Sequence, residues 1–142
     1  MGMWEDIIAF HDKFGIPVAD VPTVELPEEL MYFRIKFLQE EVDEFIEAVD
    51  AKDDVRAFDA LIDLVYVALG TARICNFPWS QGWDIVHNAN MKKVRALRKE
   101  ESKRGTTYDV VKPKGWESPD PKIASLLSTY KQSILEHREE KS

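Results

Sequence analysis

The spacing of apolar residues along the chain has the period of α-helices and gives almost no strand signal. Proline, glycine and capping residues divide the chain into segments. Gly15 and Pro17 stop the first helix, Pro27 suits a first helical turn, and Asp53 or Asp54 caps the third. The helices are expected at residues 4–14, 27–50, 54–74, 81–99 and 121–136. The predicted fold is all-α, an antiparallel helical bundle.

Two segments fall outside this helical pattern. A proline-bearing stretch up to Leu26 is expected to be extended, and residues 101–120 hold two glycines and two prolines and are expected to form a long loop. Because connections of this length are uncommon in compact domains, the loop is interpreted as a lid or as an arm that reaches a neighbouring subunit. Its apolar content, which includes Tyr108 and Trp116, argues against disorder.

Composition indicates one soluble domain over residues 1–142, with the last segment, 121–142, ending in a charged tail. Apolar residues make up 44% of the chain and charged residues 32%. No membrane span or signal peptide is recognisable, and the single Cys75 excludes an internal disulfide, so a cytoplasmic location is expected. The net charge of -7 argues against binding to duplex nucleic acid. A phosphate substrate would therefore require a divalent ion.

Acidic residues stand on helix faces that should be buried. At about 100° per residue, the apolar arc of the second helix has Glu41 near its centre and Glu44 on its edge, so both are candidates for burial. The arc consists of Leu30, Phe37, Leu38, Phe45, Ala48 and Val49. On the third helix Asp63 interrupts a run that is apolar nearly all round, with Asp59 one turn before it. Four such carboxylates would suit Mg²⁺ or Mn²⁺.

Two other interpretations remain open. The acidic block at residues 40–47 is of a kind that usually forms a solvated helix face. Arg34 lies two turns before Glu41 on the same arc and could neutralise it as a structural ion pair. Gly70, on the face of Asp63, would let another helix or a ligand approach closely.

Five segments together resemble the MazG-like all-alpha nucleoside triphosphate pyrophosphohydrolases, a superfamily that includes phosphoribosyl-ATP pyrophosphohydrolases. They span most of the chain in order, and the last two are most similar to a small phage or bacterial subgroup. The segments are FHDKFGIP (10–17), EEVDEFIEA (40–48), DALIDLVYVALGTA (59–72), VHNANMKK (86–93) and KPKGWESPD (112–120).

The resemblance implies metal ligation by Glu41, Glu44 and Asp63. Ala60 stands where the superfamily has a further acid, and Asp59 is the expected substitute. It also implies substrate contacts by His11 and Phe14 near the nucleoside and by Asn90 and Lys93 at the phosphates. Further candidates for substrate contact are Lys112 and Lys114 on the loop, and Arg34. Lys93 would also assist catalysis as a positive contact to the phosphates, and Glu40 is the expected general base.

The expected activity is Mg²⁺-dependent hydrolysis of a (deoxy)nucleoside triphosphate to a monophosphate and pyrophosphate, for cleansing or reshaping the nucleotide pool. The alternatives are a phosphoribosyl-ATP pyrophosphohydrolase and a non-catalytic helical partner-binding protein. Because five helices are too few to cover so apolar a third helix, a homodimer or a dimer of dimers is expected to complete the bundle.

Overall fold

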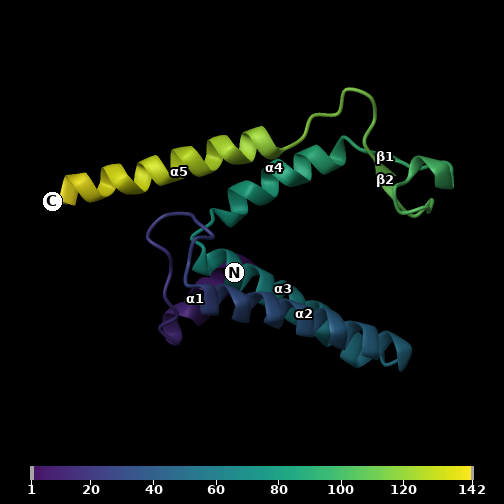
Figure 1. Ribbon diagram of the computed structural model, residues 1–142, viewed down its shortest axis with the longest axis horizontal. Coiled ribbons are helices and arrows are strands. Elements are labelled where there is room, and N and C mark those ends of the chain that lie inside the picture. The colour runs from purple at the N-terminus through teal and green to yellow at the C-terminus, as the bar shows by residue number, and fades with distance from the viewer. Residues whose placement is uncertain (1, 142) are drawn as a thin grey trace. The chain divides into compact units, whose positions relative to one another are not determined.

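The computed structural model describes residues 2–141 and is mostly helical, which confirms the all-α prediction (Figure 1). The elements are α1 (Met3–Lys13), α2 (Glu28–Asp50), α3 (Asp54–Ile74), α4 (Trp79–Met91), β1 (Val94–Arg95), a 3-10 turn (Lys99–Glu101), β2 (Val110–Val111) and α5 (Asp120–Lys141). The chain forms two compact units, one from residues up to 79 together with those from 133 onward, and one from residues 80–132. The expectation of one domain stays a prediction.

In the first unit, α2 and α3 run side by side and α1 packs against α3 (Figure 1). Local signals set their ends. Gly15, at a φ of 63°, follows the last turn of α1, and the amide of Ile16 donates to the carbonyl of His11 at 2.9 Å. Asp53 caps α3 by accepting a hydrogen bond from the amide of Arg56 at 3.0 Å. These boundaries lie within a residue or so of the predicted ones.

The segment between α1 and α2, predicted to be extended, has no regular structure, bends at residues 20–22, 24 and 26, and is held to the end of α3. The amide of Ala19 donates to the carbonyl of Ile74 at 2.8 Å, and that of Thr23 to Cys75 at 3.0 Å. The Asn76 side chain, on a residue in the left-handed region, donates to the carbonyl of Ala19 at 2.9 Å. These bonds satisfy carbonyls at the helix end and fix the path into α2.

The core of the first unit is narrow and is made largely of small side chains. Its buried apolar residues are Ile7, Ala48, Ala60, Val67, Leu69, Ala72, Ile74 and Cys75. The other side of α3 exposes a row of large apolar residues, Leu61, Ile62, Val65 and Tyr66. The helices of the first unit therefore leave this side of α3 uncovered.

The second unit corrects two predictions. Helix α4 ends at Met91 rather than at Lys99, and β1, in the segment expected to be helical, pairs antiparallel with β2, in the segment expected to be a loop. Val94 stands opposite Val111, and the amide of Ala96 donates to the carbonyl of Asp109 at 3.0 Å. Because this pairing joins residues far apart in sequence, helical periodicity alone could not reveal it. Helix α5 also runs to Lys141, beyond the predicted residue 136.

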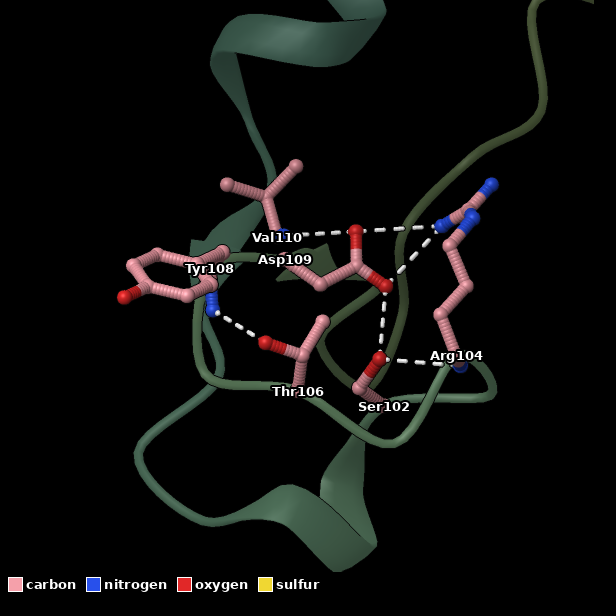
Figure 2. A network of polar contacts seen from close by, with 6 residues as sticks. All are labelled: Ser102, Arg104, Thr106, Tyr108, Asp109 and Val110. Carbon is pink, nitrogen blue, oxygen red and sulfur yellow. Dashed lines mark hydrogen bonds and ion pairs between the residues drawn. The ribbon is translucent and has the colours of Figure 1, made fainter. Parts of the chain in front are cut away.

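The turn that joins the two strands is fixed by a polar network (Figure 2). The hydroxyl of Ser102 donates to a carboxylate oxygen of Asp109 at 2.7 Å, and Arg104 donates to both oxygens of that carboxylate at 3.0 and 2.9 Å. These contacts hold the pKa of Asp109 below its usual range, first through Ser102 and then through Arg104. The segment predicted to be a lid or an arm therefore contains the turn and the second strand of a braced hairpin.

Candidate metal centre

Three carboxylates from two helices meet in the first unit. Glu41 and Glu44 are three residues apart on α2, so they share a face of that helix, and Asp63 faces them from α3. One carboxylate oxygen from each lies within 4.8 Å of the others. The structure thus brings together the three acids that the sequence singled out most strongly.

The three acids differ in exposure. Glu41 is buried, with 7% of its surface exposed, as predicted, and Asp63 is half-buried. Glu44 is exposed, so the expectation that it is buried is wrong. Its position on the edge of the apolar arc leaves its carboxylate at the rim of the α2–α3 contact, where water reaches it.

Glu41 lies in an environment that disfavours its charge. Burial raises its pKa, and the nearby carboxylates of Glu44, Asp63 and Asp59 raise it further, as does a hydrogen bond with Glu44. Its Oε2 atom is buried and has no hydrogen-bond partner. A buried carboxylate oxygen without a partner is costly, and a cation would relieve both the repulsion and the missing contact.

The chemistry of these donors fits a hard divalent ion. Mg²⁺ and Mn²⁺ prefer oxygen ligands and bind through a small number of carboxylates together with water and substrate phosphates. A buried acid beside two more accessible acids supplies such ligands. Glu41, Glu44 and Asp63 are therefore the residues that could hold the metal.

Asp59 is less closely associated with the group. It is exposed and does not belong to the set of three, although its charge acts on Glu41. Ala60, where the superfamily has an acid, is buried in the core. Glu40 is exposed beside Glu41, and its role as the general base stays a prediction.

Arg34 does not neutralise Glu41, so the ion-pair interpretation is wrong. Its buried guanidinium donates to the carbonyl of Val67 at 2.9 Å and to the hydroxyl of Thr71 at 3.0 Å. Among the described residues, the structure has no ion pair between Arg34 and Glu41. Acceptors on α3 bind the guanidinium instead of the carboxylate of Glu41. Burial also lowers the pKa of Arg34. A substrate contact by Arg34 stays a prediction.

His11 packs beside Arg34 against Gly70. A Cβ atom at Gly70 would lie 2.8 Å from Nη2 of Arg34 and 3.1 Å from Nε2 of His11, so the glycine makes room for both side chains. His11 is only 2% exposed, and burial together with Arg34 and Arg73 lowers its pKa. His11 therefore lies in the interior of the first unit, and its contact with the nucleoside stays a prediction.

The other predicted substrate contacts are divided between the two units. Phe14 is exposed and packs on Phe10, with ring centroids 4.8 Å apart. In the second unit Asn90 is exposed on α4, and the ammonium groups of Lys93 and Lys112 lie over the ring of Trp116. Lys114 lines a cleft there with Lys92 and Lys122, two residues that sequence reasoning did not single out as substrate contacts.

Comparison with known proteins connects this geometry to a family. The family model for phosphoribosyl-ATP pyrophosphohydrolase matches residues 7–90, which include all three clustered acids. A comparison with curated proteins gave no match. Within residues 2–141, no helix is both long and apolar enough to cross a membrane. The match covers more than half of the chain and confirms the resemblance to the MazG-like superfamily. The chain therefore belongs to the phosphoribosyl-ATP pyrophosphohydrolase family, whose activity is that of a nucleotide pyrophosphohydrolase.

Proposed function

We propose that this protein hydrolyses a (deoxy)nucleoside triphosphate to the monophosphate and pyrophosphate, with Mg²⁺ held by Glu41, Glu44 and Asp63. The observation that carries the proposal is the convergence of these carboxylates within 4.8 Å around a buried oxygen of Glu41 that has no partner. Mn²⁺ would substitute, since it prefers the same oxygen ligands. The enzyme would act in the cytoplasm on the nucleotide pool.

In this mechanism the oxygen of a water molecule attacks the α-phosphorus, and the bond from that phosphorus to the bridging oxygen of pyrophosphate breaks. A metal ion held by Glu41, Glu44 and Asp63 would supply Lewis-acid activation of the water and would screen the phosphoryl charge. Glu40, exposed next to the cluster, takes the proton of the water. Asp59 adds negative charge near Glu41 and favours occupation by a cation. Asn90, Lys93, Lys112 and Lys114 are proposed to contact the phosphates, and His11, Phe14 and Arg34 to shape the nucleoside end.

A second substrate is favoured by the family match itself. Phosphoribosyl-ATP carries the same triphosphate chemistry, and the family takes its name from that activity. The C-terminal segment at residues 112–120, which resembles the small phage or bacterial subgroup, lies outside the range that the family model matches. We therefore keep phosphoribosyl-ATP as the second candidate, with the same residues in the same roles.

We further propose that the active form is a homodimer or a dimer of dimers. The apolar residues that α3 exposes line an open groove of about 410 Å³ together with Met3 and Ile7 of α1. Contiguous apolar surface of this kind marks contact sites. A second copy of the chain would cover it and complete the bundle.

A pyrophosphate-release screen tests the proposed activity. Ribo- and deoxynucleoside triphosphates and phosphoribosyl-ATP are each incubated with the protein and Mg²⁺. We expect release from at least one triphosphate, and release from phosphoribosyl-ATP alone would replace the first substrate with the second. Release from none of them would overturn the enzymatic proposal and favour the partner-binding alternative.

Glu41→Gln gives the residue-level test of the same proposal. Removing the buried negative charge should lower turnover at least about a hundredfold while leaving the helical circular dichroism unchanged. Asp43→Asn is the matched control, because Asp43 is an exposed acid on the same helix that bonds only Gln39 in the described structure. Activity retained by Glu41→Gln would exclude Glu41 from the site.

A further inference from the structure

The second unit contains a cleft that the proposed metal centre does not use. Its volume is about 410 Å³, which falls in the range of pockets that hold small molecules. It opens between α4 and the segment that leads into α5, and its lining includes Lys92, Lys114 and Lys122. These three lysines come from the turn after α4, a loop and the first turn of α5, so the fold rather than the sequence gathers them.

Trp116 fixes the shape of the cleft. Its indole N–H donates to the carbonyl of Ala89 at 2.8 Å, which attaches the loop to the last turns of α4. The Nζ atoms of Lys93 and Lys112 lie 5.3 and 5.0 Å from the centroid of its ring. Cation–π contacts of this kind hold both ammonium groups at the tryptophan. The cleft wall is therefore braced before any ligand arrives.

The lysines around Trp116 fall into two groups. Lys93 and Lys112 lie against the ring of Trp116. Lys92, Lys114 and Lys122 line the cleft, where Glu117 is the only acid among the lining residues. A cleft with three ammonium groups and one carboxylate, in a protein of net charge -7, selects a compact polyanion with several charges.

We infer that this cleft binds the oligophosphate chain of a nucleotide without needing a metal ion. Lysine is a common ligand of phosphate, and three of them match a chain of several charged groups. Ile85, Pro113 and Pro119 supply an apolar wall beside the lysines, where the organic part of the ligand can lie. The inference rests on the proposed function only for the identity of the ligand.

Calorimetric titration of inorganic tripolyphosphate into the full chain, in EDTA, tests the inference without turnover. The double variant Lys92→Gln and Lys122→Gln should bind about a hundredfold more weakly, since each lost charge contact costs about tenfold, or roughly 1.4 kcal/mol. Lys131→Gln, on an exposed residue further along α5, should bind like the unmodified protein.

Two further measurements complete the test. Replacing Lys92 and Lys122 with arginine keeps the charge and should retain binding, and circular dichroism checks that each variant folds. Pyrophosphate should bind more weakly than tripolyphosphate, because it has fewer charged groups to fill the cleft. Tighter binding of pyrophosphate would overturn the assignment to the substrate chain and indicate a product site.

The inference is overturned if the unmodified protein gives no heat with tripolyphosphate, or if the glutamine double variant binds as tightly. This result is distinct from failure of the proposed function. Binding that persists when no nucleotide releases pyrophosphate would remove the enzymatic proposal and leave the cleft in place. Turnover of a nucleotide without binding of tripolyphosphate in EDTA would remove the cleft as a binding site and leave the enzymatic proposal in place.

Discussion

At the scale of single residues, the sequence identified Glu41 and Asp63 because each breaks an apolar pattern on its own helix. That signal is local, so it survives without knowledge of the fold, and the burial of Glu41 is confirmed. The partners of Arg34 could not be found in this way. Its acceptors, Val67 and Thr71, lie 33 and 37 residues further along the chain. Only the packing of α2 on α3 brings them together.

His11 predicts how stability depends on pH. Its pKa is lowered from 6.5 by burial and by the charges of Arg34 and Arg73, with a smaller opposing effect of Asp12. A lowered pKa means that the unfolded chain takes up the proton first. Stability is therefore fully present above pH 6.5 and is lost as the pH falls toward the lowered value.

Thermal unfolding of the unmodified protein and of His11→Gln, followed from pH 8 to pH 5, measures this effect. The difference in midpoint between the two proteins should be constant above about pH 6.5 and should shift in favour of the variant below it. A difference that stays constant throughout would show that His11 titrates normally.

At the scale of elements, capping and proline signals predicted the ends of α1, α2 and α3 closely. The end of α4 was missed because the residues after Met91 belong to a strand whose partner lies beyond the turn at Ser102 and Asp109. The sequence up to Lys99 has no breaker, and only the pairing of β1 with β2 shows that the helix has stopped. Long-range pairing decides against local propensity here.

Two helical glycines give a matched test of packing. Gly82→Ala in α4 has nothing within 4 Å of the added Cβ, so it should raise the free energy of unfolding by about 0.5–1 kcal/mol. In Gly70→Ala, on α3, the added Cβ would press on the Arg34 side chain, which its hydrogen bonds hold in place. This change should lower the free energy of unfolding by about 1–3 kcal/mol. Thermal or urea unfolding measures both. A stabilising Gly70→Ala would contradict the packing described for Arg34 and His11.

At the scale of the whole molecule, the fold class followed from composition and periodicity, and the division into two units did not. No change in composition marks residue 80, so the boundary depends on which segments pack together. The uncovered apolar face of α3 was foreseen, because a helix that is apolar nearly all round needs more neighbours than one chain provides. Which molecule covers that face stays a prediction.

Light scattering tests the proposed oligomer. The unmodified protein should have at least twice the mass of one chain, and Val65→Glu, a change in the α3 groove, should reduce the mass to that of a monomer. Val55→Glu is the control, since Val55 is 79% exposed on the same helix and does not line the groove. A monomeric unmodified protein would exclude the proposed dimer.

The central claim is that Glu41, Glu44 and Asp63 form a divalent metal site. Calorimetric titration of Mn²⁺ into the metal-free protein, with no nucleotide present, tests it most directly. The account predicts saturable heat that Glu41→Gln and Asp63→Asn abolish, that Asp59→Asn weakens less, and that Asp43→Asn leaves unchanged. Absence of heat in the unmodified protein, or heat that survives both Glu41→Gln and Asp63→Asn, would contradict the claim.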